Sequence, residues 1–164
     1  MRMLRGLLIL LALTLAVAGC GTDTTTDEAD GAGATDLAFT ATTLEGEEFD
    51  GTSLDGTPTV LWFWAPWCPT CRGQIPTVSG LGRTYDGQVD VVAVGGLDTQ
   101  GEIEALAAEI DHVTHLVDDE GVVWKHFGVT AQSTYTVIDA DGEIVHEGYL
   151  EDEALEDLVA GLAG

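Results

Sequence analysis

Basic residues are the scarcest chemical class in this sequence. Of its 164 residues, five are Lys or Arg, whereas 29 are Asp or Glu. Every acidic residue lies after Cys20, and that part of the chain keeps only Arg72, Arg83 and Lys125 as cations. Such a negative field repels nucleic acid and anionic membrane surfaces and keeps a protein soluble. The composition therefore argues against nucleic-acid binding, and we interpret it as adaptation to a salty habitat or a bias of the lineage rather than as a sign of a cationic partner.

Cysteine is also rare, since the chain has only Cys20, Cys68 and Cys71. So few cysteines exclude a small fold held together by several disulfides. The last two are separated by two residues, and a bridge between them can persist outside the cytoplasm. The spacing therefore predicts a Cys68–Cys71 pair that cycles between dithiol and disulfide.

The sequence has no long apolar run. The longest, residues 7–18, has about a dozen residues, whereas a membrane-spanning helix needs roughly 20. Two arginines precede it and small residues follow it, which is the pattern of a secretory signal. Residues 17–20, Val-Ala-Gly-Cys, resemble a bacterial lipobox, which implies cleavage before Cys20 and lipid on its sulfur. An ordinary cleavable signal with an incidental cysteine is the alternative.

Three segments follow from this pattern. Residues 1–19 are the predicted signal peptide. Residues 20–36 are the predicted lipidated linker, because Thr, Asp, Gly and Ala bury too little surface to offset the entropy of ordering. Residues 37–164 are the predicted folded domain, which is long enough for one hydrophobic core.

Hydrophobic patterning predicts an α/β domain. Residues 59–64 form a continuous apolar, β-rich run, which is typical of a strand buried on both faces, and Asp141-Gly142 is a strong hairpin signal. A hairpin is expected at residues 38–49, further strands at 59–64, 89–94, 113–117, 134–138 and 143–149, and helices at 68–81, 102–110, 122–127 and 151–162. This alternation predicts a mixed sheet covered by helices.

The chemistry is expected in the stretch Phe-Trp-Ala-Pro-Trp-Cys-Pro-Thr-Cys-Arg, residues 63–72. A cysteine at a helix N-terminus has a lowered pKa, because unpaired N–H groups and the helix dipole stabilise its thiolate. A second cysteine three residues later lies on the same face, within reach to resolve a mixed disulfide. We therefore predict that Cys68 is the exposed, attacking thiol and Cys71 the more buried, resolving thiol.

The distribution of acidic residues agrees with this assignment. No Asp or Glu occurs in residues 56–85, and that window contains Arg72 and Arg83. A nearby carboxylate raises the pKa of a thiol, whereas a nearby arginine lowers it. Exclusion of acids from a buried strand explains part of this gap.

The motif resembles the active site of the thioredoxin superfamily, and the chain from residue 37 to 162 resembles its extracytoplasmic TlpA/ResA/DsbE-like branch. Trp-Cys-x-x-Cys after an apolar strand and Pro76, five residues after Cys71, carry the resemblance. It implies a thioredoxin-like α/β fold, a central mixed sheet flanked by helices, with an N-terminal β-hairpin and an extra helix.

The implied activity is dithiol–disulfide exchange with protein substrates at the extracytoplasmic face of a bacterial membrane, without an organic cofactor or metal. Apocytochromes and secreted proteins are the substrate classes considered. Besides the two cysteines, the residues expected to tune the site or form its substrate surface are Pro66, Trp67, Pro69, Thr70, Arg72, Gln74, Pro76, Gln132, Ser133 and Thr134.

Two positions depart from the family pattern. Ser133 stands where a cis-proline is expected, and a cis bond before a non-proline residue costs about 2.5–4 kcal/mol. We therefore predict a trans Gln132–Ser133 bond, and expect Ser133→Pro to change substrate release more than stability. Gln74 stands where many relatives have Glu, and it cannot act as a base.

Two other functions are compatible with the same residues. One is a non-catalytic binding lipoprotein, suggested by Ser133 and Gln74. The other is a copper or zinc carrier, because a Cys-x-x-Cys pair binds metal when two further ligands are present. His112 and His115 are a poor chelate on a strand, where residues three apart point to opposite faces. The sequence leaves open whether exchange runs in the reducing or the oxidising direction.

Overall fold

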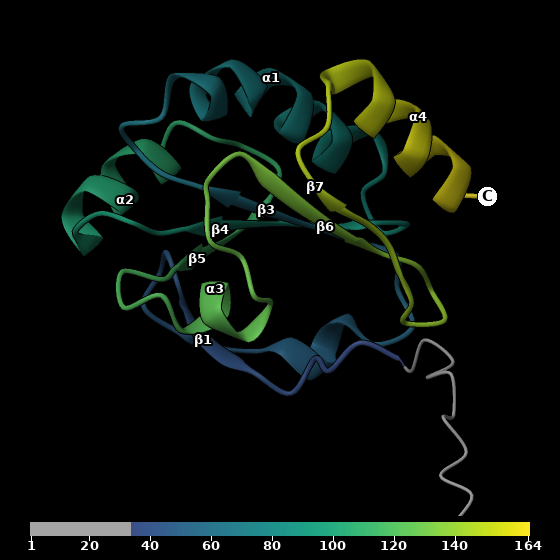
Figure 1. Cartoon of the computed structure of the whole chain (residues 1–164), viewed down its shortest axis with the longest axis horizontal. Helices are drawn as coiled ribbons and strands as arrows, with labels where there is room; N and C mark the ends of the chain where they lie inside the picture. The colour runs from purple at the N-terminus through teal and green to yellow at the C-terminus, as the bar shows by residue number, and fades with distance from the viewer. Residues whose placement is uncertain (1–33) are drawn as a thin grey trace, which may run out of the picture. The chain divides into compact units, whose positions relative to one another are not determined.

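A seven-stranded sheet lies at the centre of the part that the structure, a computed structural model, describes, residues 34–164 (Figure 1). Its strand order is β2-β1-β5-β4-β3-β6-β7, with β3, β4 and β5 parallel and the other pairings antiparallel. The mixed sheet expected from the sequence is thus confirmed. The strands are β1 (Thr40–Thr43), β2 (Glu48–Asp50), β3 (Thr59–Trp64), β4 (Asp90–Gly95), β5 (Thr114–Val117), β6 (Thr134–Ile138) and β7 (Ile144–Gly148).

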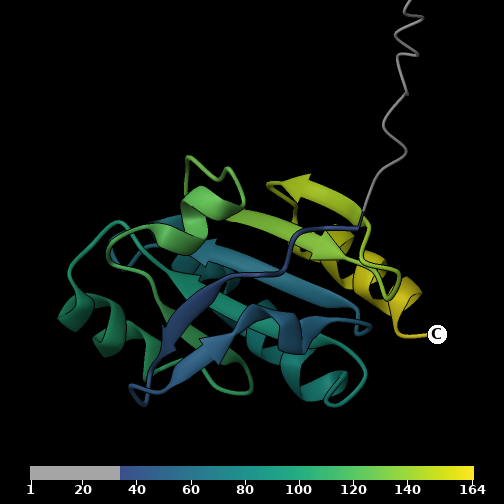
Figure 2. The ribbon, with the colours of Figure 1, turned by 90° about the horizontal axis from the view of Figure 1, so that it is seen from below.

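Helices cover both faces of this sheet. In Figure 1, α1 and α4 lie above it, whereas α3 and the short 3-10 turn η1 lie below. Figure 2, seen from below, shows the β1–β2 hairpin and α3 on the near side and α4 behind the sheet. The helices are α1 (Pro69–Thr84), α2 (Gln100–Ala107), α3 (Val122–His126), α4 (Asp152–Leu162) and a short 3-10 turn, η1 (Gly51–Leu54).

Strand β3 is buried on both faces of the sheet, so elements on both sides are needed to cover it. All six of its residues are buried, and successive side chains of a strand point to opposite faces. Trp62 and Trp64 join the hydrophobic cluster that includes residues of α1, α2 and α4. Leu61 and Phe63 join the cluster that includes η1 and α3. The continuous apolar run therefore has a separate core on each side.

Strands β3 and β6 have the predicted bounds, whereas the other helices and strands differ from theirs by one to three residues. Helix α1 continues to Thr84, because the Tyr85 N–H still bonds the Leu81 carbonyl. Helix α2 begins and ends earlier than the expected 102–110, since Thr99 caps its start by accepting from the Glu102 N–H. Strand β5 begins one residue later than expected, two residues after His112, which has a positive φ of 64°.

Thr35, two residues before the predicted domain start, is hydrogen-bonded to the turn between β6 and β7. Its N–H and its hydroxyl both donate to the Gly142 carbonyl, at 2.7 and 2.8 Å. The predicted signal peptide, the lipidation site Cys20 and most of the predicted linker lie outside the described residues. Among the helices from residue 34 onward, none has the length and apolar character needed to cross a membrane.

Candidate redox site

The first turn of α1 places a sulfur at the positive end of the helix. Cys68 is the N-cap, and its Sγ accepts from the Cys71 N–H at 3.1 Å. Pro69 occupies the first turn, where its missing N–H costs little, and that turn contains no acidic residue. A thiolate at this position is stabilised by a direct N–H donor and by the helix dipole.

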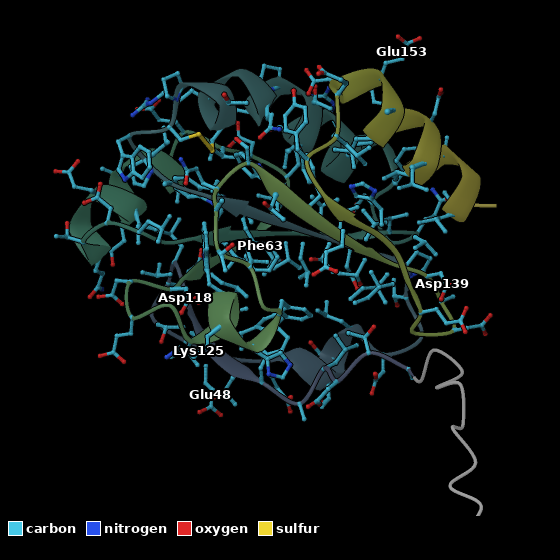
Figure 3. All side chains as sticks on the ribbon, in the orientation of Figure 1. Glu48, Phe63, Asp118, Lys125, Asp139 and Glu153 are labelled. Carbon is cyan, nitrogen blue, oxygen red and sulfur yellow. A yellow bond between two sulfur atoms is a disulfide. The ribbon has the colours of Figure 1, made fainter. Side chains whose placement is uncertain are left out.

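Cys68 and Cys71 form a disulfide, with their Cα atoms 5.3 Å apart. Figure 3 draws it as a yellow bond beside the N-terminal end of α1. The expected exposure of Cys68 was wrong in degree: it is only 3% exposed, against 0% for Cys71. Cys68 is therefore the more accessible of the two, but the surrounding chain covers most of it.

Trp67 forms the exposed rim beside this disulfide, as its position next to Cys68 predicts. Its side chain is 54% exposed, and its Nε1 donates to the Leu97 carbonyl at 3.1 Å. Leu97 is 50% exposed and has a positive φ of 59°. Sequence reasoning missed Leu97, because nothing in its local pattern shows that the loop after β4 reaches Trp67.

Ser133 lies against both sulfurs. No peptide bond in residues 34–164 is cis, so the predicted trans Gln132–Ser133 bond is confirmed. The Ser133 hydroxyl oxygen is 3.2 Å from Cys71 Sγ and 3.4 Å from Cys68 Sγ. Its φ is +64°, a conformation that costs a non-glycine residue of the order of 1–3 kcal/mol.

The polar neighbours of the dithiol are neutral where they are buried. Gln74 is 3% exposed, and its Oε1 accepts from Trp62 Nε1 at 2.9 Å. The Arg72 Nε donates to the Pro66 carbonyl at 3.0 Å, which ties its guanidinium to the loop before Cys68. The Gln74 amide therefore provides polarity but no carboxylate behind the disulfide.

The other predicted site residues make no hydrogen bond to either sulfur. Thr134 Oγ1 donates to the Ala131 carbonyl at 2.8 Å. Pro76 lies inside α1, as expected for a helix-kinking proline. Their burial varies: Pro66 is buried, Pro69, Thr70 and Pro76 are exposed, and Gln132 and Thr134 are half-buried.

Two histidines, His115 and His126, are bonded to backbone carbonyls away from the cysteines. His115 is 9% exposed, and its Nε2 contacts the Ile110 carbonyl at 2.8 Å, while His126 Nε2 contacts the Asp36 carbonyl at 2.6 Å. Among residues 34–164, no group of three or more His, Cys, Asp or Glu side chains is placed to hold a metal ion.

A mixed sheet with a disulfide at the N-terminus of the helix that follows its central strand defines a thioredoxin-like dithiol protein. Comparison with known families agrees: the Redoxin family matches residues 29–162. The chain belongs to the Redoxin family.

Individual relatives have related names. The soluble secreted antigen MPT53 of Mycobacterium tuberculosis is 38% identical over 110 residues, covering 65% of this chain and 61% of MPT53. The chain therefore matches less than two thirds of the length of that relative. The thiol-disulfide oxidoreductase ResA of Bacillus thuringiensis is 28% identical over 111 residues, covering 66% of this chain and 64% of ResA.

Two solved structures are similar to a larger part of the chain. The structure of MTB dsbF in mixed oxidised and reduced forms has a TM-score of 0.72 and 40% identity, covering 77% of this chain and 96% of that one. A secreted M. tuberculosis disulfide oxidoreductase homologous to E. coli DsbE has a TM-score of 0.69 and 34% identity, covering 77% and 97%. The thioredoxin-like fold expected from the sequence is thus confirmed.

Proposed function

We propose that this chain is a thiol–disulfide oxidoreductase that exchanges disulfides with protein substrates through Cys68 and Cys71. The observation that carries the proposal is the Cys68–Cys71 disulfide at the N-terminus of α1, with the Cys71 N–H donating to Cys68 Sγ. This arrangement supplies the two requirements of reversible exchange, a stabilised thiolate and a second sulfur within bonding reach.

The reducing direction has two steps. The Cys68 thiolate attacks a substrate disulfide, so that one substrate sulfur leaves as a thiolate and the other is bound to Cys68. The Cys71 thiol then loses its proton to water, and its sulfur attacks Cys68 Sγ, which forms the Cys68–Cys71 disulfide and releases the second substrate thiolate. Two electrons pass from the enzyme dithiol to the substrate. The oxidising direction is the exact reverse, starting from the disulfide.

Trp67 and Leu97 form the surface that a substrate meets. Both are about half exposed, and the Trp67–Leu97 hydrogen bond holds the indole beside Cys68. Aromatic side chains of this kind bind apolar segments through their large surface while a polar edge stays hydrogen-bonded. We therefore expect partly unfolded secreted proteins or apocytochromes, whose cysteines and apolar residues are accessible, as substrates.

The proposed location is the extracytoplasmic face of a bacterial membrane, with the chain tethered by lipid on Cys20. The signal-like residues 1–19 and the lipobox-like residues 17–20 support this location. Export, though not the tether, is also supported by the similarity to MPT53, which is named a soluble secreted antigen. Expression in a bacterium with labelled palmitate tests the tether. Label should enter the wild type and not Cys20→Ser, and equal labelling of both would contradict it.

The activity is tested with the purified full-length chain in detergent. We expect it to catalyse either reduction of insulin by a dithiol or oxidative refolding of a reduced secreted protein, and Cys68→Ser to abolish both. Cys20→Ser is the matched control, since it removes a cysteine outside the dithiol. Wild-type activity in Cys68→Ser would exclude the proposed function, and stoichiometric metal after anaerobic purification would favour the carrier alternative.

A further inference from the structure

The hydroxyl of Ser133 is placed to bond either sulfur of the dithiol. It lies 3.2 Å from Cys71 Sγ and 3.4 Å from Cys68 Sγ, although Ser133 is more than 60 residues further along the chain. The side chain is only 8% exposed, so bulk water does not compete freely for it. No other side chain in residues 34–164 makes a hydrogen bond to either sulfur.

The backbone holds this hydroxyl in place. The Ser133 N–H donates to the Phe63 carbonyl at 3.0 Å, which extends the β3–β6 pairing by one residue. The positive φ of 64° is strained for serine, and such conformations persist where the surrounding structure determines them. The position of the hydroxyl is thus set by the central strand that also leads to Cys68.

The chemistry of the two sulfurs differs. Cys68 Sγ already accepts from the Cys71 N–H at 3.1 Å at the helix N-terminus, so it is the sulfur that carries the negative charge on reduction. The nearby Gln74 cannot take a proton from Cys71, and its Oε1 is bonded to Trp62. A hydroxyl has one donor hydrogen and two acceptor lone pairs, so it can donate to a thiolate and accept from a thiol at the same time.

We propose that Ser133 is a positioning residue that bridges the reduced dithiol, donating its O–H to the Cys68 thiolate and accepting the S–H of Cys71. The inference rests on the proposed function. An external dithiol that reduces the disulfide gives up two electrons and two protons and becomes a disulfide itself. The Cys68–Cys71 bond breaks, one proton goes to Cys71 and the other to solvent, and Cys68 becomes a thiolate. The Ser133 hydrogen is not transferred. Ser133 thereby favours the reduced form.

The pKa of Cys68 tests this bridge. The titration is made on the full chain with Cys71→Ala, so that one thiol of the pair remains and the two titrations are not coupled. Adding Ser133→Ala should raise the Cys68 pKa by about one unit, as expected for losing a hydrogen bond to a charged group. Alkylation by iodoacetamide below both pKa values should slow about tenfold.

Two further variants separate the hydroxyl from the backbone. Ser133→Gly also lacks the hydroxyl but relieves the positive φ, so it should show the same shift as Ser133→Ala. Ser53→Ala removes an exposed hydroxyl that bonds only the Asp50 carbonyl, and it should show none. An unchanged Cys68 pKa in Ser133→Ala or Ser133→Gly would overturn the inference, because the hydroxyl would then not be the cause.

The redox equilibrium with glutathione gives a second readout in the chain with both cysteines. Ser133→Ala should lower the reduction potential by about 30 mV per tenfold loss of thiolate stabilisation. Exchange with glutathione in the wild type combined with an unchanged potential in Ser133→Ala would overturn the bridge and leave the proposed function intact. Absence of exchange in the wild type would remove the proposed function itself, while the Cys68 titration would still decide the hydrogen bond.

Discussion

Replacing Ser133 by proline should destabilise the fold, contrary to the expectation from the sequence that it would mainly change substrate release. Proline holds φ near −65° and has no N–H, whereas Ser133 has φ +64° and donates to the Phe63 carbonyl. The Phe63 carbonyl would lose the hydrogen bond from the residue-133 N–H, which costs about 1–3 kcal/mol. Forcing an incompatible φ adds more than about 1 kcal/mol, so the expected total is about 2–4 kcal/mol.

Urea unfolding of the oxidised chain measures this loss. The midpoint should fall without a change in slope, because the same surface is exposed on unfolding. Ser133→Ala is the matched variant: it keeps the N–H and the backbone conformation, so it should lose about 1 kcal/mol or less. A Ser133→Pro chain as stable as Ser133→Ala would show that the reasoning about the backbone at this position is wrong.

Three other variants give expected outcomes. Gly82→Ala should lose about 1–3 kcal/mol of unfolding free energy, because a Cβ at that position overlaps the His112 carbonyl. Gly80→Ala on the same helix meets open space, so its unfolding free energy should be unchanged or higher by up to about 1 kcal/mol. Equal unfolding free energies for the two variants would contradict the packing of α1. Burial lowers the pKa of His115 below its unfolded value of about 6.5. As the pH falls through the unfolded value, the unfolded chain takes up the proton before the folded chain does, so the free energy of unfolding decreases. Between about pH 7.5 and about pH 5.5, the wild type should therefore lose more unfolding free energy than His115→Asn. Equal losses in the two chains would refute the effect of His115 burial. Trp67→Ala should slow exchange with protein disulfides and leave the glutathione equilibrium unchanged, since its 54% exposed indole belongs to the proposed substrate surface and makes no hydrogen bond to either sulfur. Unchanged protein kinetics would remove Trp67 from that surface.

Much of the fold could be predicted because local pattern and tertiary environment agree. The apolar run at residues 59–64 is strand β3 with the expected bounds, and residues 134–138 are β6. Helix ends were less predictable. The last turn of α1 contains Gly82, which lies close to the carbonyl of His112, and this tertiary contact has no local sequence signal.

In the candidate site, too, some features could be predicted from the sequence and others could not. The positions of Cys68 and Cys71 follow from local spacing at a helix N-terminus, so they could be predicted. The burial of Cys68 and its contact with Ser133 depend on which strands pair, since β6 joins β3 from more than 60 residues away. The sequence indicates that Ser133 is unusual, but not that its hydroxyl lies beside both sulfurs.

The most direct test of the central claim is to trap the mixed disulfide. The full chain with Cys71→Ser is incubated with a protein disulfide, and the linked cysteine is identified by mass spectrometry. The account predicts a stable adduct on Cys68, and no adduct when Cys68→Ser is treated in the same way. Adduct formation through Cys71 in Cys68→Ser at the rate seen for Cys71→Ser would contradict the assignment of Cys68 as the attacking thiol.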